Sequence, residues 1–399
     1  MANFTTLADV CESVRYGYTA SASLDACGPR FLRITDIVPD SIQWNLVPYC
    51  EIDDSNKERF TLDVGDIVIA RTGATVGYAK LIREPVDAVF ASYLVRFRVD
   101  STKADPGFIG RLVESQVYKS FVQSRIGGAA QPNASAPVLG SFEFRLPPLF
   151  SQERIADILS GYDDLIENNR RRMALLEDSA RLLYNEWFVR LRFPGFEHTH
   201  IIDGLPEGWK RTTISGLGKV ITGKTPSTKD SDNFGTFVPF IKTPDMHVSS
   251  IVMFTEEYLS EKGANSQKNK TLPPNSILVA CIGAKLGVVS LNGLESQTNQ
   301  QINAVVPANE CLTYYAYFTL KDFREKLLAI GGGATMPNVN KTKFESMSIA
   351  IPAQYLLDSF HETVKHNFEQ IKTLILMNKK LETARDLLLP RLISGEIVV

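Results

Sequence analysis

One stretch of the chain matches the P-loop pattern G-x-x-x-x-G-K-[ST], in which a glycine-rich turn and a lysine hold nucleotide phosphates. The match covers residues 218–225. In a P-loop, the turn follows a buried strand and opens a helix whose N-terminal amides bind the phosphates. Here Pro226 comes directly after the match and disfavours helical angles at Thr225. The sequence therefore argues against a nucleotide hydrolase.

Other catalytic patterns are also missing from the sequence. It contains no N-P-P-Y-like run for methylation of a base amino group, no G-x-S-x-G and no H-E-x-x-H. The five cysteines lack C-x-x-C spacing and are typical of reduced thiols in a cytosolic protein, and the five histidines are scattered. We therefore predict a cytoplasmic, non-catalytic chain without a metal site.

Two glycine motifs with neighbouring polar residues suggest binding rather than catalysis. Gly-Ala-x-x-Gly occurs at residues 73–77 and again at 283–287, each time between two apolar runs. This pattern predicts a hairpin whose small residues let the backbone approach a large ligand closely. The cations and hydroxyl near these tips are Arg71, Thr72, Lys80 and Lys285. The alternative is an ordinary turn with solvated charges.

A run of amides, Asn299-Gln300-Gln301, is a second candidate for recognition. Amide side chains can pair bidentately with the edge of an adenine base. The alternative is that these residues are ordinary surface amides.

The glycine motifs belong to a longer internal repeat. Phe31-Leu32-Arg33 matches Phe240-Ile241-Lys242, and Pro132-Asn133 matches Pro337-Asn338, at offsets that drift from 209 to 205. The glycine pair at 127–128 likewise matches the pair at 331–332. A period of about 200 residues is domain-sized, well above the 20–50 residues of solenoid repeats. Each copy reads as mixed α and β, with one helix predicted at 109–125 and its counterpart at 314–328.

Each copy is followed by a heptad pattern. Apolar residues recur at spacings of four and three from Ile155 to Trp187, interrupted by Asn169. No proline occurs from 151 to 192, so one helix of about 36 residues, roughly 54 Å long, is predicted. A similar stripe from Val364 contains Asn378 and is predicted to end at Pro390. We expect the two helices to pair antiparallel, with both asparagines fixing the register; the alternative is a core helix of the adjoining domain.

The predicted fold class is therefore α+β: two similar mixed α/β recognition domains joined by two long antiparallel helices that form a coiled coil, with an internal pseudo-two-fold repeat. The predicted divisions are domain 1 at 1–148, helix 1 at 149–192, domain 2 at 193–352 including a linker at 193–209, and helix 2 at 353–399.

Composition narrows the classes of function. With 399 residues, 44% of them hydrophobic, the chain can bury two cores, and no apolar stretch reaches the roughly 18 residues of a membrane span. The net charge of −2 argues against nucleic-acid binding by charge alone. Any DNA contact must come from local cations or from partner proteins.

The helix segments resemble the specificity subunit of type I restriction–modification systems. The likeness lies in residues 175–188, from Leu-Leu-Glu to Asn-Glu-Trp-Phe, in Arg-Leu-Arg-Phe-Pro-Gly at 190–195, and in the closing segment at 384–397. In layout it covers the whole chain.

The resemblance implies that each domain reads one half of a bipartite, asymmetric sequence in double-stranded DNA and that the helices set the unread spacer. It also implies two modification subunits that methylate adenine with S-adenosylmethionine, and two restriction–translocase subunits that use ATP and Mg²⁺. All three cofactors would belong to these partners.

The candidate residues follow from these patterns. The predicted DNA contacts are Arg33, Arg71, Thr72, Lys80, Lys242, Lys285, Asn299, Gln300 and Gln301. The predicted partner contacts, on the outer face of the helices, are Arg170, Arg171, Arg172, Trp187 and Phe188. Two rival hypotheses are a coiled-coil adaptor with two protein-binding heads and no DNA binding, and a P-loop enzyme.

Overall fold

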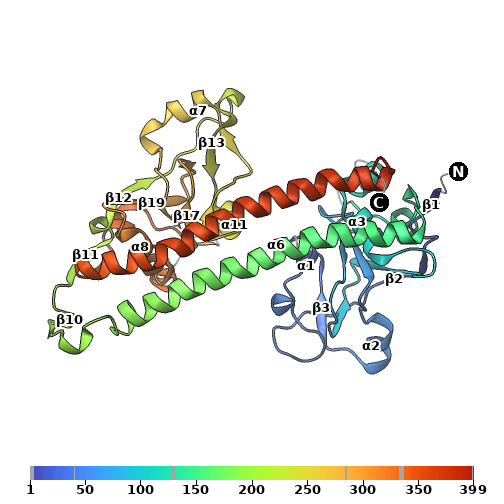
Figure 1. The fold of residues 1–399 in the computed structure, drawn as a ribbon, viewed down its shortest axis with the longest axis horizontal. Helices are drawn as coiled ribbons and strands as arrows, with labels where there is room; N and C mark the ends of the chain where they lie inside the picture. Colours follow the sequence, from blue (N-terminus) through green and yellow to red (C-terminus); the bar gives the residue numbers. More distant parts are fainter. Residues whose placement is uncertain (1–3, 40, 127–131, 284, 332–336, 398) are drawn as a thin grey trace. The chain divides into compact units, whose positions relative to one another are not determined.

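The chain folds into two compact units. The computed structural model describes residues 4–39, 41–126, 132–283, 285–331, 337–397 and 399. Unit 1 comprises Met1–Leu165 and Leu381–Val399, and unit 2 comprises Ile166–Lys380. Unit 1 is therefore built from both ends of the chain, which appear in blue and red in Figure 1.

The core of unit 1 is a four-stranded antiparallel sheet in the order β2-β7-β4-β5. Its strands are β2 (Cys11–Tyr16), β7 (Leu94–Val99), β4 (Asp66–Ala70) and β5 (Ala79–Leu81). Strand β4 is buried on both faces, since Ile67 and Ile69 enter one hydrophobic cluster while Val68 and Ala70 enter another. Side chains alternate between the faces of a strand, so the unbroken apolar run of this strand reflects cores on both sides of the sheet.

Smaller elements complete unit 1. A parallel pair joins β3 (Arg30–Leu32) to β6 (Ala88–Phe90), and an antiparallel pair joins β1 (Phe4–Thr6) to β8 (Glu143–Arg145). The helices of this part are α1 (Ile34–Ile37), α2 (Asp54–Phe60), α3 (Pro106–Glu114), α4 (Gln116–Arg125) and α5 (Ala136–Gly140).

Unit 2 repeats this plan. Its five-stranded sheet has the order β12-β19-β16-β17-β14, and the first four strands pair in the same antiparallel sequence as β2-β7-β4-β5. The strands are β12 (Gly218–Thr222), β19 (Ile302–Pro307), β16 (Ile277–Ala280), β17 (Val289–Asn292) and β14 (Ile251–Val252). The buried strand β16 again divides its side chains between two clusters. The predicted internal repeat and the mixed α/β character of both domains are confirmed.

The remaining elements of unit 2 surround this sheet. Strand β13 (Phe234–Ile241) pairs in parallel with β18 (Gln297–Thr298) and antiparallel with β15 (Tyr258–Leu259). Strand β11 (Lys210–Thr213) pairs with β20 (Ser348–Ile351), and β9 (Ile201–Ile202) pairs with β10 (Leu205–Pro206). The helices are α7 (Glu261–Ser266), α8 (Leu312–Lys321), α9 (Arg324–Gly331) and α10 (Lys341–Glu345).

Two long helices pass from one unit into the other, α6 (Leu149–Tyr184) with 36 residues and α11 (Gln354–Ser394) with 41. In unit 2 they lie side by side (Figure 1), and Asn169 donates from Nδ2 to Oδ1 of Asn378 at 2.8 Å. Further along, Asn367 donates to the carbonyl of Leu176 at 3.1 Å. From Asn169 to Leu176 along α6, the bonded residue on α11 moves back from Asn378 to Asn367. The two helices therefore run antiparallel, as predicted.

In unit 1 the same helices meet around a carboxylate. Asp163 of α6 accepts from Nη1 of Arg385 on α11 at 2.7 Å and from Nη1 of Arg83 at 3.1 Å, and it also pairs with Arg111 of α3. Burial lowers the pKa of Arg111 to about 10. Leu392, only 3% exposed, packs in the core of unit 1 together with Ile155 and Leu159.

Three expectations about helices were wrong. The helix predicted at 109–125 is interrupted at Ser115, which ends α3 and caps α4 by accepting from the amide of Tyr118. The counterpart predicted at 314–328 is likewise two helices, α8 and α9. Helix α11 does not end at Pro390 but continues to Ser394. A proline removes one helical hydrogen bond, and the burial of Leu392 in unit 1 offsets that loss.

We predict that Asn169→Leu lowers the free energy of unfolding by about 1–3 kcal/mol, because it removes the donor to the buried Oδ1 of Asn378. Urea denaturation of the purified chain measures the change. The matched control, Asn168→Leu at an exposed position of the same helix, changes it by less than about 0.5 kcal/mol. Equal effects of the two substitutions would contradict a stabilising asparagine pair.

Candidate nucleic-acid interface

The Gly-Ala-x-x-Gly segments form the same turn in both units. In unit 1 the turn joins β4 to β5: Gly73 and Gly77 have φ of 79° and 86°, and the Gly77 amide donates to the Ala70 carbonyl at 2.9 Å. In unit 2, Gly283 and Gly287 have φ of 92° and 87°, with the matching bond at 2.8 Å. Such angles strain residues with a side chain, which is why glycine occupies them. Ala284, within the second turn, lies outside the described residues.

Each turn is bonded to the Pro-Asn segment of its own unit. Gly73 donates to the carbonyl of Pro132 at 3.0 Å, and Gly283 donates to that of Pro337 at 3.0 Å. Two motifs that are widely separated in sequence therefore meet at one place in each unit. Of the glycine pairs that precede these segments, residues 127, 128 and 332 lie outside the described part of the chain.

We call the glycine turn, the Pro-Asn segment bonded to it and the neighbouring backbone of each unit its frame. In unit 2 the segment that matches the P-loop pattern belongs to this frame. Residues 218–222 form strand β12, and residues 223–230, all described, contain no helix. A Cβ on Gly223 would lie 2.1 Å from the carbonyl oxygen of Asn299, and one on Gly17 would lie 2.2 Å from that of Ala91. These glycines serve close backbone packing rather than phosphate binding.

In unit 1 the frame presents aromatic and cationic side chains. The guanidinium of Arg71 lies 4.7 Å from the ring centroid of Tyr16, and its Nη2 donates to Oδ1 of Asn133 at 3.3 Å. The Arg71 amide donates to the carbonyl of Tyr93, whose side chain is 57% exposed. The prediction from sequence named Arg71 but missed Tyr16, Tyr93 and Asn133. The internal repeat could have identified Tyr93, because Tyr93 in the first copy is equivalent to Gln301, a predicted DNA contact, in the second.

In unit 2 the equivalent place carries the predicted amides. The carbonyl of Gln301 accepts from the Cys281 amide at 2.8 Å, as that of Tyr93 does from Arg71. The side-chain oxygen of Gln301 accepts from Asn299 at 3.1 Å and from Thr243 at 3.2 Å. Asn299 is buried and so orients Gln301 rather than facing solvent.

Gln300 is the amide best placed to contact a ligand. It is exposed, and its Oε1 accepts one hydrogen bond, from Thr225 at 2.7 Å. An amide oxygen has two lone pairs, so one acceptor site of Gln300 remains beside its NH₂ donors. This is the combination that pairs bidentately with adenine.

Two of the predicted DNA contacts are already paired with carboxylates. Arg33 bonds Asp36 through Nη2 at 3.0 Å, which raises the pKa of Arg33, and Lys242 pairs with Glu257. Both residues precede a short helical turn, and each donates its backbone amide to the carboxylate of the aspartate three residues later. Arg33 donates to Asp36 at 2.8 Å and Lys242 donates to Asp245 at 2.7 Å. The matched Phe-x-Arg and Phe-x-Lys segments therefore have at least a structural role.

The other predicted DNA contacts are near the frame or on the neighbouring strand. Thr72 is half-buried and its backbone bridges that of Asn133. Lys80 is half-buried on β5, opposite Val68. Lys285 is exposed in the second glycine turn; burial and the Lys285 ammonium together lower the pKa of His247.

The predicted partner contacts divide into two groups. Arg171 and Arg172 are exposed on α6, and Arg170 is half-buried. Phe188 is not on an outer face as expected: it is 8% exposed and packs 5.0 Å from the rings of both Tyr315 and Phe360. Trp187 is half-buried against the same cluster. A π-helical turn at Asn185–Val189 follows α6, and these large rings gain more by burial in the core than by exposure.

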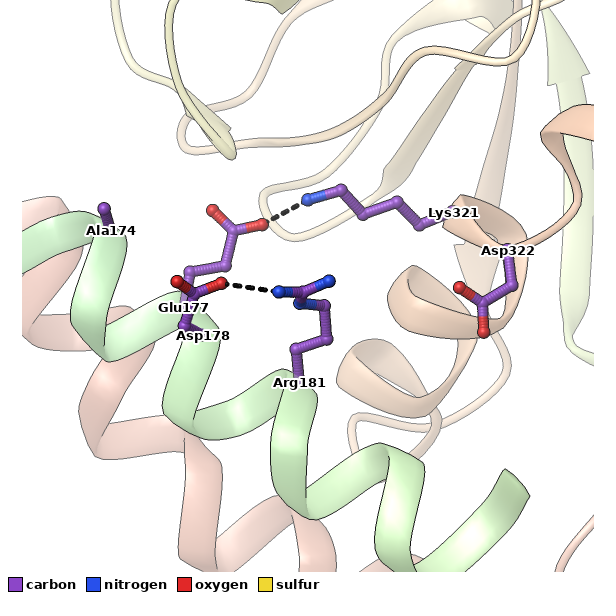
Figure 2. A pocket seen from close by; sticks show the side chains of 6 residues that line it. All are labelled: Ala174, Glu177, Asp178, Arg181, Lys321 and Asp322. Atoms are coloured by element: carbon purple, nitrogen blue, oxygen red, sulfur yellow. Dashed lines mark hydrogen bonds and ion pairs between the residues drawn. The ribbon is translucent and has the colours of Figure 1, made fainter. Parts of the chain in front are cut away.

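A hollow that the sequence did not reveal lies between α6 and α8 within unit 2 (Figure 2). Glu177 pairs with Lys321 and accepts from the hydroxyl of Tyr317 at 2.8 Å, while Arg181 pairs with Asp178 at 3.0 Å. Burial raises the pKa of Asp322. These ion pairs largely neutralise one another. On α6, Leu175 and Leu182 are 69% and 63% exposed, at heptad spacing.

None of the helices in the described part of the chain combines the length and the hydropathy of a membrane-spanning segment. The same residues contain no group of three or more His, Cys, Asp or Glu side chains arranged to hold a metal ion.

Two units that carry different side chains on one backbone frame define a tandem recognition protein. Comparison with known proteins identifies the family. The model of the type I restriction modification DNA specificity domain matches residues 3–178 and 206–356. The HindI specificity subunit of Haemophilus influenzae is 30% identical, covering 88% of this chain and 91% of the relative. The MjaIX specificity subunit of Methanocaldococcus jannaschii is 25% identical, covering 84% of this chain and 76% of the relative.

The crystal structure of a type I restriction–modification S subunit from M. genitalium has the same fold. It matches with a TM-score of 0.57 at 14% identity, over 98% of this chain and 96% of that one. The chain belongs to the type I restriction modification DNA specificity family and is a non-catalytic specificity subunit. The family match favours this function over the adaptor hypothesis and over a P-loop enzyme.

If the exposed amide of Gln300 reads an adenine, we predict that Gln300→Leu weakens binding of the cognate duplex at least about fivefold and relaxes selectivity at that adenine, because leucine cannot form a bidentate amide contact. Competition binding with single-base variants of the target measures both effects, using the chain in complex with its modification subunits. Gln370→Leu, at an exposed position on α11, leaves both unchanged. A uniform loss of affinity across all variants would argue against base reading by Gln300.

Proposed function

We propose that each unit reads one half of a bipartite, asymmetric target in double-stranded DNA. The observation that carries this proposal is the shared frame: the glycine turn, the Pro-Asn segment and the amide donated to the Tyr93 or Gln301 carbonyl recur with the same hydrogen bonds. On this frame unit 1 places an arginine and tyrosines, whereas unit 2 places amides. The same backbone with different side chains suits two half-sites of different sequence.

We further propose that α6 and α11 set the unread spacer and bind two modification subunits. Support comes from the exposed apolar pair Leu175 and Leu182 on α6, the helix that also lines the ion-paired hollow (Figure 2). Exposed apolar residues at heptad spacing suit a partner helix. The proposed contacts at Arg170, Arg171 and Arg172 lie on the same helix.

The chemistry in this proposal belongs to the partners. The modification subunits would bind S-adenosylmethionine and methylate adenine, and two restriction–translocase subunits would use ATP and Mg²⁺ to cleave unmethylated DNA in the cytoplasm. The chain's net charge of −2 fits this division, because partners that enclose the duplex would supply much of the phosphate contact.

Exchange of a whole unit tests the proposal. Because Leu392 and Arg385 complete unit 1, residues 1–165 must be exchanged together with 381–399, taken from a relative of different specificity. Methylome sequencing of cells that carry the modification subunits should show a bipartite motif for the wild-type chain. The hybrid should keep one half-site and change the other.

The matched control exchanges residues 1–148 alone. This variant pairs a foreign unit 1 with the native end of α11, so we expect a less stable chain and weaker methylation. A hybrid of the full unit that alters both half-sites, or a wild-type chain that directs no bipartite motif, would contradict the proposal.

A further inference from the structure

The guanidinium of Arg71 is held in one orientation by two neighbours, Tyr16 and Asn133. It stacks over Tyr16 at 4.7 Å, and Nη2 donates to Asn133 at 3.3 Å. The Tyr16 hydroxyl accepts from the amide of Ala136 at 2.9 Å, so its ring is fixed both by β2 and by the start of α5. Asn133 is fixed by its backbone bridge to Thr72. A planar guanidinium that is supported in this way is preorganised for a planar ligand.

Among the described residues, no carboxylate neutralises the charge of Arg71. Within the described ranges Arg71 makes no ion pair, whereas Arg33 pairs with Asp36 at 3.0 Å and Arg98 with Asp66 at 2.7 Å. An arginine has five N–H donors. One bonds Asn133 and the Nε–H is buried without a partner, so the other three donors, all on the two Nη nitrogens, remain for a ligand.

Comparison with unit 2 shows that the fold does not require this arginine. The Arg71 carbonyl accepts from Ala134 at 2.8 Å, and the equivalent carbonyl of Cys281 accepts from Val339 at 2.9 Å. Yet Cys281 is 1% exposed and uncharged in its context, since burial raises the pKa of its thiol to about 11. The frame is therefore stable without a cation here, and the arginine serves something specific to unit 1.

We propose that Arg71 reads a guanine in the half-site bound by unit 1, donating hydrogen bonds from its Nη nitrogens to O6 and N7. This inference rests on the proposed function. Arginine matches the two acceptors of guanine in the major groove, and such a pair discriminates against other bases. A phosphate contact needs only a nearby cation. The stacking on Tyr16 and the bond to Asn133 also fix the plane of the Arg71 guanidinium, which favours a planar base over a phosphate.

The glycine turn explains how the base can be reached. Arg71 directly precedes the turn, and a Cβ on Gly73 would meet no atom within 4 Å, so the tip is open. The residue whose carbonyl accepts from the Arg71 amide, Tyr93, has an exposed side chain, and the ring of Tyr16 lies under the guanidinium. Cation and aromatic ring together form a surface of the kind that contacts base edges.

The test uses the chain in complex with its modification subunits and the duplex found by methylome sequencing. Each guanine of the half-site assigned to unit 1 is replaced in turn by 7-deazaguanine, which lacks the N7 acceptor. With the wild-type protein, we expect at least about a fivefold loss of affinity at one position. Arg71→Ala and Arg71→Lys should bind the normal duplex more weakly and show no further loss with 7-deazaguanine at that position.

Arg59→Ala is the matched control. Like Arg71, Arg59 lies in unit 1 with its guanidinium over an aromatic ring, that of Phe60 at 5.4 Å, although Arg59 is exposed whereas Arg71 is half-buried. The Arg59 carbonyl accepts from Arg15, and alternation along β2 places Arg15 on the opposite face from Tyr16. This variant should therefore keep the wild-type response to every 7-deazaguanine duplex.

The outcomes separate the two proposals. If no 7-deazaguanine position affects wild-type binding, guanine reading by Arg71 is overturned even if the variants fail to fold. If Arg71→Ala weakens all duplexes equally and lowers the salt dependence by about one counterion, Arg71 contacts phosphate and only this inference fails. If the wild-type complex does not distinguish its target from a scrambled duplex, the proposed function fails and the inference falls with it.

Discussion

The packing of α6 against α11 is the constraint on which both units depend. In unit 2 the helices bury an apolar seam interrupted by the Asn169–Asn378 hydrogen bond, which penalises any shift that would leave either amide unpaired. In unit 1 Asp163 holds α11 through Arg385, and Leu392 fills the core. Burying such a leucine contributes about 1.5–3 kcal/mol. Residues 381–399 therefore complete a unit whose other residues, 1–165, lie far away in the sequence.

The duplicated frame separates folding from recognition. Backbone hydrogen bonds and glycines with positive φ build the frame, and these recur in both units. The side chains on it differ: Arg71 corresponds to the buried Cys281, and Tyr93 corresponds to Gln301. Because the frame is made by the main chain, side chains can change without loss of the fold, which is what a protein with two variable recognition sites requires.

The features that could be predicted from the sequence are those that depend on periodic or repeated residues. The heptad spacing predicted α6 and the antiparallel asparagine pair, and the repeat predicted two similar units. Features decided by tertiary packing were missed. Ser115 divides a helix that looks continuous because its hydroxyl caps α4, and α11 passes through Pro390 because Leu392 is buried. Phe188 looked like a partner contact but lies in the core, since periodicity does not show which side of a helix end is covered. No sequence motif contains Tyr16, and only the structure shows its ring under the Arg71 guanidinium.

The central claim, that the two units read separate halves of one target, is tested most directly by photo-crosslinking. A crosslinking amino acid is placed at the exposed positions of Tyr93 in unit 1 and of Gln300 in unit 2, one at a time, in the complex with modification subunits. The duplex carries a different label in each half-site. We predict that the Tyr93 position crosslinks to one half-site and the Gln300 position to the other. Crosslinks from both positions to the same half-site, or only to the spacer, would contradict the account.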